Sequence, residues 1–459
     1  MRLERWCAVA LVLLGVSVPT LLQPACNPAA DGGGDGGMNP AGPPVILGAS
    51  MGITGGLSGN TRALKGALAV ATQQINAAGG ILGRQVQFVI QDDQSSPTFA
   101  PTAVGDLLEA GAQGILGPGA SSEVMVVMPV LAAAQTVEVS ATATSILLTQ
   151  SQTAASPGWF FRTVPNDSYQ GRAVVQFAVA GPNPDAGVPG CKKMAIVYNQ
   201  DSYGMPMDAI IEPRMMAAGG SIVASIGVPA STLGSYATQA AQIVTAQPDC
   251  MAMVVFSPTG AQLVRDLKTA IQADTSHDWS HFFIIGTDGC FDPTFIVDGR
   301  QNPNDPTSPS VVEGVYGTTA DTAPPIPEYA SLQNLYITQI GLASDQTDLD
   351  PYTANEYDAA ILLALAIEHA GGFSDPTKVR DGMFAVSHGL TATPQVFGPS
   401  QIPEAIAAVA QGQDINYQGA SGNVDFTPSG DVVGGFIVWE VVQGQYSTYD
   451  RITAAQLEN

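Results

Sequence analysis

Apolar residues along the chain recur in two spacings that alternate. Short uninterrupted apolar runs, such as residues 45–49, predict strands that are buried on both faces. Between these runs, apolar residues stand three or four positions apart, as Leu64, Leu68 and Ile75 do within residues 58–78, and this spacing predicts amphipathic helices. Repeated strand–helix alternation is typical of a parallel sheet with helices on both faces.

The alternation runs twice, with a restart after Phe161-Arg162. In the first run the expected strands are 45–49, 86–91, 114–116 and 137–140, and the expected helices are 58–78, 102–110 and 121–134. In the second run the expected strands are 194–198, 221–228, 251–256, 282–286 and 314–318, and the expected helices are 203–218, 235–246 and 260–273. The sequence therefore predicts two consecutive doubly wound α/β units of similar size.

The last third of the chain has a different pattern. It predicts helices at 329–340, 353–370 and 377–386, and strands at 423–426 and 434–442. A helical block with a terminal hairpin cannot easily form a core of its own. We therefore expect these elements to complete the two sheets already formed.

The N-terminus has the features of an export signal. Arg2 and Arg5 precede an apolar run at 8–22, so residues 1–25 are expected to be a signal peptide. The sequence Ala25-Cys26 resembles a bacterial lipoprotein cleavage site, although Leu22 stands four residues before the cysteine where the usual pattern has three. We expect lipidation at Cys26; cleavage by ordinary signal peptidase near Ala25 is the alternative. Residues 26–44 are rich in Gly, Pro, Asp and Asn and predict a flexible tether.

Composition and charge narrow the class of protein. Apolar residues make up 45% of the 459 residues, which excludes global disorder and allows large cores. The chain has 16 Lys and Arg against 40 Asp and Glu, a net charge of −24. Nucleic acid is excluded as an expected partner, because phosphate binding requires clustered basic residues.

Motifs for catalysis, phosphate binding or metal binding are absent from the sequence. The Gly-rich segment 55–59 lacks the lysine of a phosphate-binding loop, and Ser121 is not flanked by the two glycines of a nucleophile elbow. His277 and His281 are separated by Asp278-Trp279-Ser280, which is not a zinc-protease motif. Residues 345–350 lack the glycine and spacing of a calcium loop. We expect no metal, no cofactor and no enzymatic activity.

Polar residues gather where the predicted parallel strands end. In the first unit these are residues 119–122, which open a helix, and 140–145; in the second they are 201–203, 257–259 and 287–289. Open α/β sheets bind ligands at this edge, and a helix N-terminus suits a carboxylate. Each residue alone is equally explained as an ordinary helix cap. Their common location predicts a ligand cleft with hydroxyls in one unit and an acid and an aromatic in the other.

The sequence also resembles a known family. The segment Ile75-Asn76-Ala77-Ala78-Gly79-Gly80-Ile81-Leu82-Gly83-Arg84, with Asp92-Asp93 after it, is similar to the leucine/isoleucine/valine-type periplasmic binding proteins, the type I solute-binding proteins of ABC transporters. Further similar segments follow in the family's order at 117–122, 139–144, 161–165, 201–204, 286–289, 313–317, 357–360 and 434–436. The resemblance spans about residues 45–445.

The resemblance implies a fold and a set of ligand contacts. It implies two doubly wound parallel-sheet lobes, joined by a three-crossover hinge, that close around a ligand. The ligand's carboxylate would meet Ser121 or Ser122, Thr142 and Thr144; its ammonium would meet Asp288; Tyr203 would cover the site; and Gly56, Leu57 and Thr259 would contact the rest of the ligand. The family often has an aromatic residue where 257–259 stands here, so the resemblance implies a pocket unlike the branched-chain one.

The same resemblance sets the expected domain boundaries. They are 1–25 for the signal peptide, 26–44 for the tether, 45–165 and 321–425 for lobe 1, 166–320 for lobe 2, and 426–459 for C-terminal strands that complete lobe 2.

Export permits disulfides. Cys191 and Cys250 precede the first and third strands of the second unit, which are neighbours in a sheet ordered 2-1-3-4 and lie about 4.8 Å apart. We hypothesise a Cys191–Cys250 disulfide, with Cys290 near the ligand cleft and its state open.

The expected function is that of an exported, lipid-anchored monomer. It would capture an amino acid or a similar small carboxylate and deliver it to an ABC permease. The alternative is a ligand-binding sensory module that acts through a partner protein.

Overall fold

The structure is a computed structural model that describes residues 42–152, 158–182, 189–229, 234–305, 307–342 and 348–458. The expected signal peptide, Cys26 and nearly all of the expected tether lie outside the described residues. All contacts reported below belong to one compact unit, Pro40–Asn459.

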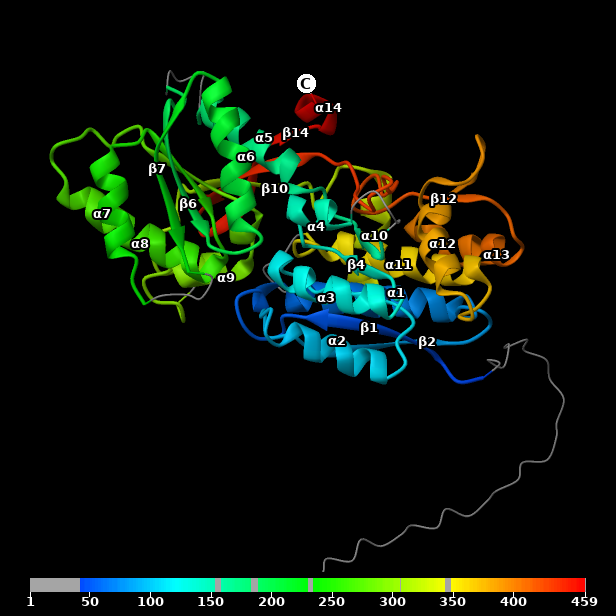
Figure 1. The fold of residues 1–459 in the computed structure, drawn as a ribbon. Coiled ribbons are helices and arrows are strands. Elements are labelled where there is room, and N and C mark those ends of the chain that lie inside the picture. Colours follow the sequence, from blue (N-terminus) through cyan, green and yellow to red (C-terminus); the bar gives the residue numbers. More distant parts are fainter. Residues whose placement is uncertain are drawn as a thin grey trace, which may run out of the picture. The chain divides into compact units, whose positions relative to one another are not determined.

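The first sheet has five parallel strands in the order β2-β1-β3-β4-β5 (Figure 1). Its strands are β1 (Val45–Met51), β2 (Val86–Asp92), β3 (Ile115–Leu116), β4 (Glu138–Ser140) and β5 (Phe160–Arg162). Alternate residues of β1 face opposite ways: Val45, Leu47 and Ala49 join one apolar cluster, and Ile46 packs against another. Helices α1 (Thr61–Ala77) and α11 (Thr353–Ala370) contribute to the first cluster, and α2 (Ala100–Glu109) and α3 (Ser121–Ala133) to the second.

Helix α11 is the central helix of this lobe. Every residue from Thr353 to Ile367 is buried; the part from Ala359 to Ile367 is apolar all round, as expected of a buried helix, whereas Asn355, Glu356 and Asp358 are buried polar residues. It packs against α1, α12 (Pro376–His388) and α13 (Ile402–Ala410). The remaining elements here are α4 (Ile146–Ser151), α10 (Pro327–Gln339), the short helices η1 (Ser58–Asn60) and η4 (Pro399–Gln401), and a parallel pair, β11 (Gln395–Phe397) and β12 (Ile415–Tyr417).

The second sheet has seven strands in the order β14-β13-β10-β9-β8-β6-β7. The strands are β6 (Lys193–Asn199), β7 (Ser221–Val228), β8 (Cys250–Val254), β9 (Phe283–Gly286), β10 (Tyr316–Ala320), β13 (Phe436–Val442) and β14 (Gln445–Ile452). The first five are parallel, and β13 and β14 are antiparallel to their neighbours. Its helices are α5 (Asp167–Ala180), α6 (Gly204–Ala217), α7 (Ala237–Ala246), α8 (Ser257–Ala273), η3 (Asp288–Cys290), α9 (Pro293–Gly299) and α14 (Ala454–Glu458).

Both faces of the second sheet are covered. Met194 and Ile196 of β6 join the apolar cluster that includes α5 and α6, whereas Ala195 and Val197 join the cluster that includes α7 and α8. The prediction of two doubly wound α/β lobes is confirmed.

The C-terminal hairpin differs from the expectation. The expected strand at 423–426 is not a strand; Val424 and Phe426 are buried there, but the segment pairs with no sheet. The true partner of β13 is β14, an edge strand whose residues are mostly exposed. Its polar sequence, Gln-Tyr-Ser-Thr-Tyr-Asp-Arg-Ile, shows no apolar run, because most of its side chains are exposed to solvent.

The disulfide joins neighbouring strands of the second sheet. Strands β6 and β8 pair with Met194 opposite Cys250, and Cys191 and Cys250 are bonded with their Cα atoms 5.7 Å apart. Cys290 is a free, buried cysteine whose Sγ contacts the carbonyl oxygen of Val255 at 3.2 Å.

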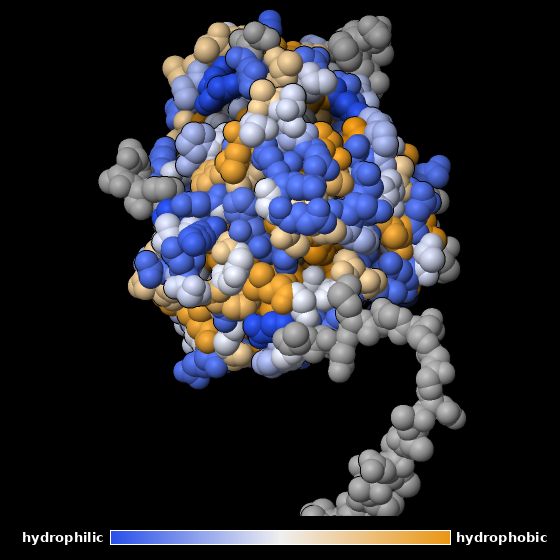
Figure 2. All heavy atoms as spheres, turned by 90° about the vertical axis from the view of Figure 1, so that its right-hand side faces the viewer, coloured by the Kyte–Doolittle hydropathy of each residue, from blue (hydrophilic) through white to orange (hydrophobic). Residues whose placement is uncertain are grey.

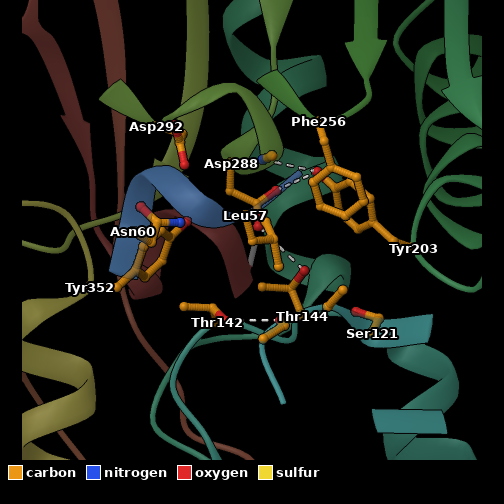
Figure 3. A pocket seen from close by; sticks show the side chains of 13 residues that line it. Leu57, Asn60, Ser121, Thr142, Thr144, Tyr203, Phe256, Asp288, Asp292 and Tyr352 are labelled. Atoms are coloured by element: carbon orange, nitrogen blue, oxygen red, sulfur yellow. Dashed lines mark hydrogen bonds between the residues drawn. The ribbon is translucent and has the colours of Figure 1, made fainter. Parts of the chain in front are cut away.

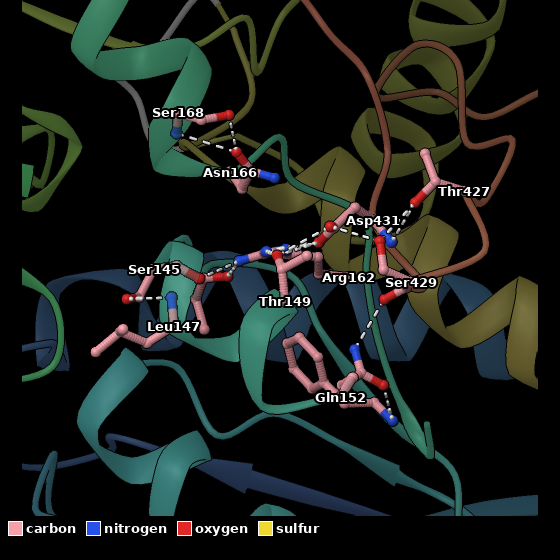
Figure 4. A network of polar contacts seen from close by, with 12 residues as sticks. Ser145, Leu147, Thr149, Gln152, Arg162, Asn166, Ser168, Thr427, Ser429 and Asp431 are labelled. Atoms are coloured by element: carbon pink, nitrogen blue, oxygen red, sulfur yellow. Dashed lines mark hydrogen bonds and ion pairs between the residues drawn. The ribbon is translucent and has the colours of Figure 1, made fainter. Parts of the chain in front are cut away.

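The chain passes between the two sheets three times: after β5, after β10 and before β13. A buried ion pair ties the first passage to the third (Figure 4). Arg162, at the end of β5, is fully buried and donates from Nε to Asp431 Oδ1 at 2.5 Å. Its Nη1 donates to the carbonyl oxygens of Ala143 and Ser145 at 3.1 and 3.0 Å. The second passage meets the third where Asp321 N donates to Gly435 O at 3.0 Å.

The surface shows scattered apolar residues. In the face drawn in Figure 2, hydrophilic and apolar residues are interspersed. Isolated exposed apolar side chains, such as Met205 and Leu390, are normal on soluble surfaces. Among the helices of the described residues, none is long and apolar enough to cross a membrane.

Candidate functional site

A cavity lies where the strands of both sheets end at their carboxyl edges (Figure 3). The space between its lining atoms is about 380 Å³, which includes some open solvent. Loops of the first lobe contribute Leu57, Asn60, Gly119, Ala120, Ser121, Thr142 and Thr144; the second lobe contributes Tyr203, Phe256, Asp288, Gly289 and Asp292; and Tyr352 precedes α11. This is the edge at which open α/β sheets bind ligands.

One wall of the cavity presents hydrogen-bond donors. Helix α3 begins at Ser121, and the first N–H groups of a helix have no intrahelical acceptor and carry partial positive charge. Ser121 Oγ accepts a hydrogen bond from Ser145 N at 3.1 Å, so its own proton is free to be donated elsewhere. Thr142 Oγ1 donates to Gly119 O at 2.9 Å, which fixes this side chain beside the helix start.

A buried acid stands in the same helix turn. Glu123 Oε2 accepts from Ala120 N at 2.8 Å. Burial, and then the nearby Asp93 carboxylate, raise the pKa of Glu123 well above the usual glutamate range, which favours its neutral form. A neutral Glu123 does not repel a carboxylate at the start of α3.

The opposite wall carries a buried carboxylate. Asp288 is 9% exposed, and its Oδ1 accepts from Tyr203 OH at 2.6 Å. The Tyr203 ring stacks on Phe256 with the ring centres 5.3 Å apart. Burial raises the pKa of Asp288, and the Tyr203 hydroxyl opposes this shift. Charge removed from water is costly unless it is paired, so a cation in the cavity would stabilise Asp288 in its charged form.

A second acid lies behind Asp288. Asp167 is fully buried, and its pKa is raised well above the usual range by burial and then by the charge of Asp288. Neither carboxylate oxygen of Asp167 has a hydrogen-bond partner. This wall therefore holds two buried carboxyl groups.

Close contacts between the two lobes border the cavity. Thr144 Oγ1 of the first lobe lies 3.4 Å from Asp288 Oδ2 of the second. Elsewhere, η1 approaches the start of α9 so closely that a Cβ added to Gly59 would lie 2.0 Å from Asp292 Oδ1. The cavity therefore has walls from both lobes and is partly open to solvent.

The structure brings together most, but not all, of the residues singled out in the sequence. Ser121, Thr142, Thr144, Tyr203, Asp288 and Leu57 line the cavity, and Ser122, Gly56 and Thr259 do not. Thr259 is buried in α8, where its Oγ1 accepts from Tyr236 OH at 3.1 Å. Ser122 lies one residue further into α3 than Ser121, and the position of a Cβ at Gly56 faces open space.

Four lining side chains were not found from the sequence. Phe256 comes one residue before the segment 257–259, so the cavity does have an aromatic residue just after β8. Its position after a predicted strand is the signal that could have identified it. Asn60, Asp292 and Tyr352 come from a short helix, a helix cap and the residue before α11. None of these positions follows a strand, so the apolar pattern gives no signal for them.

Tyr352 has an unusual backbone. Its φ is 64°, in the left-handed region that non-glycine residues seldom adopt. The side chain is 3% exposed, and its hydroxyl lies 3.1 Å from Thr319 Oγ1. Such outliers persist where the surroundings impose them, often at ligand sites.

The fold and the site define a two-lobed α/β protein with a ligand cavity between its lobes. The family model described as "Periplasmic binding protein" matches residues 44–413, and the chain belongs to this family. The family consists of solute-binding proteins, and membership implies an exported protein. Among the described residues, no group of three or more His, Cys, Asp or Glu side chains is placed to hold a metal ion.

Individual relatives differ in what they bind or serve. The chemotactic signal transduction system substrate-binding protein BasB of Halobacterium salinarum is 24% identical, with 90% of each chain covered. The solved structure of LivJ from Streptococcus pneumoniae in complex with isoleucine has a TM-score of 0.67 and 16% identity, covering 89% of this chain and 99% of that one. A solute-binding protein of R. palustris in complex with benzoate has a TM-score of 0.67 and 16% identity, covering 90% and 96%.

Proposed function

We propose that the protein captures an amino acid or a similar small carboxylate between its lobes and delivers it to an ABC permease. The arrangement that carries this proposal is the pairing of two opposite walls in one cavity. The start of α3, with Ser121 and Thr142, offers donors to a carboxylate, and Asp288, held by Tyr203, offers a charge to an ammonium. An α-amino acid carries both groups on one carbon.

Capture would occur by hinge closure. In our proposal lobe 1 (45–165 and 321–425) and lobe 2 (166–320 with 426–459) move as bodies about the three crossovers. Because Thr144 and Asp288 approach to 3.4 Å across the cavity, the lobes would open to admit a ligand. The ligand favours closure because only the closed form pairs its ammonium with the buried Asp288.

The test is the substitution Asp288→Asn in the mature protein, measured by isothermal titration with a panel of amino acids and of carboxylates without an amino group. Removing the charge should weaken binding of amino ligands by far more than ten-fold, because the ammonium loses its counter-charge in a desolvated site. The control is Asp381→Asn. Asp381 is an exposed acid that pairs with Arg380 and does not line the cavity, so this substitution should leave ligand affinity unchanged. Equal affinity for the Asp288→Asn protein and the unaltered protein would reject the role of Asp288.

A sensory role is the second candidate. It is favoured by the relative BasB, which is described as part of a chemotactic system and is similar over 90% of this chain. In that case the closed lobes would be read by a partner receptor instead of a permease. Deleting the gene would then abolish the chemotactic response to the ligand and leave its uptake unchanged; the transport proposal predicts the reverse.

Anchoring at Cys26 is a further part of the proposal. A lipid there, followed by the tether 26–44, would hold the binding protein at the membrane near its partner. Mass spectrometry of the mature N-terminus should find a diacylglyceryl group on Cys26. An unmodified N-terminus near Ala25 would show a freely exported form.

A further inference from the structure

We propose that the ligand carries a second cationic group, as basic α-amino acids do, and that Asp292 and Asn60 receive it at one end of the cavity. This inference rests on the proposed function and names its ligand class. The second group would be an ammonium or a guanidinium on the ligand's side chain.

The first observation is an unpaired carboxylate oxygen. Asp292 is 2% exposed and lines the cavity, and Figure 3 shows its side chain directed toward the space beside Asn60. Its Oδ1 accepts from Thr294 N at 2.6 Å and from the Thr294 hydroxyl at 2.5 Å, but its Oδ2 has no hydrogen-bond partner. A buried carboxylate oxygen without a donor is costly, so this oxygen is suited to a donor supplied by the ligand.

A second unpaired acceptor lies at the same end. Asn60 is 7% exposed, lines the cavity and has no partner for its Oδ1. In Figure 3 the side chains of Asn60 and Tyr352 stand together on one side of Leu57, away from Tyr203 and Phe256. Two acceptors left without donors at one end call for a group with several N–H bonds, which ammonium and guanidinium groups possess.

The charge of the walls points the same way. Asp288 and Asp292 both line the cavity, Asp167 lies behind Asp288, and the lining includes no Lys, Arg or His. The buried Arg162 is held by Asp431. A neutral amino acid brings one positive group for Asp288 and leaves Asp292 without a counter-charge. A basic amino acid supplies both, and Leu57 and the ring of Tyr352 can flank its methylene stem.

The alternative explanation of Asp292 is structural. Asp292 is the N-cap of α9, and that role uses only Oδ1. Asparagine caps a helix as well as aspartate does. The substitution Asp292→Asn therefore preserves the cap and removes only the charge, which makes it a selective probe of ligand binding.

The experiment is isothermal titration of the mature protein with lysine, ornithine, arginine, leucine and isoleucine. At least one basic amino acid should bind ten-fold or more tightly than leucine. Asp292→Asn should weaken the basic ligands at least ten-fold and leave leucine unchanged or tighter. The control Asp298→Asn changes an exposed acid of α9 that does not line the cavity and should alter neither class.

The outcomes separate this inference from the proposed function. If leucine binds as tightly as lysine and depends on Asp288 but not on Asp292, the inference is wrong and the proposed function stands. If Asp292→Asn weakens both classes equally, Asp292 acts on the structure of the site and the inference is again wrong. If a diamine without a carboxylate binds as tightly as lysine, the cationic end is supported and the carboxylate wall loses its proposed role.

Discussion

The buried ion pair between Arg162 and Asp431 should contribute much more to stability than an ion pair at the surface. Replacing Asp431 with asparagine leaves the Arg162 guanidinium, whose side chain is 0% exposed, without its counter-charge. Breaking a buried pair by removing one partner costs about 3–5 kcal/mol. Because Nη1 keeps its bonds to the carbonyls of Ala143 and Ser145, we expect a loss at the low end of that range, about 3 kcal/mol.

The chain offers a matched control at another crossover. Asp321 pairs with Arg451, whose side chain is 38% exposed, and exposed pairs are worth about 0–1 kcal/mol. Asp321→Asn should therefore lower the free energy of unfolding by less than about 1 kcal/mol. The assay is urea unfolding followed by circular dichroism at pH 7. The unfolding free energies of the variants are compared when they fall with urea concentration at the same slope.

A small effect of Asp431→Asn would contradict this expectation. If Asp431→Asn and Asp321→Asn lower the free energy of unfolding equally, the burial of Arg162 does not set the energy of its ion pair. The tie between the first and third crossovers would then be only a geometric feature of the hinge.

Three further predictions follow from other parts of the molecule. Tyr203→Phe removes the 2.6 Å hydrogen bond to Asp288; since a bond to a charged group is worth about 1.5–3 kcal/mol, calorimetry should show amino ligands bound about 10- to 100-fold more weakly, and unchanged affinity would contradict it. Replacing Cys191 and Cys250 with alanine opens a link across 59 residues, so urea unfolding should show a loss of about 4 kcal/mol with ligand affinity retained; a loss below about 1 kcal/mol would count against it. Burial raises the pKa of Glu356 to about 8, so its contribution to stability is complete below the unfolded pKa near 4.5 and is lost as the pH rises through 8. The free energy of unfolding of Glu356→Gln, relative to that of the unaltered protein, should therefore rise between these two pH values. A difference that stays constant with pH would count against the raised pKa.

The two-sheet architecture could be predicted because parallel strands that are buried on both faces appear in the sequence as uninterrupted apolar runs. Runs such as 194–198 and 251–256 contain almost no polar residue, and the helices between them show apolar residues at regular spacing. The order 2-1-3-4 of the second unit, and with it the neighbourhood of Cys191 and Cys250, followed from that topology. Elements with exposed or polar positions show a weaker apolar pattern. Strand β14 is polar because one side faces solvent, and helix α5 was missed because buried polar residues such as Asp167 and Gln170 interrupt its apolar spacing.

A site residue could be predicted from the sequence only where it follows the carboxyl end of a strand. Ser121, Tyr203 and Asp288 follow β3, β6 and β9. Because the carboxyl ends of parallel strands lie at one edge of a sheet, these residues come to the edge that borders the cavity. Asn60 and Tyr352 reach the cavity through contacts between elements far apart in the chain. No local pattern of residues records such tertiary placement, and the same holds for Asp292 at the cap of α9.

Isothermal titration of the mature protein with the common amino acids, ornithine and benzoate shows whether this cavity binds an amino acid through Asp288. We expect that at least one amino acid binds, that benzoate does not compete with it, and that Asp288→Asn abolishes the binding. Binding of benzoate in the absence of any amino-acid binding, or amino-acid binding that survives Asp288→Asn, would show that Asp288 does not hold an ammonium in this cavity.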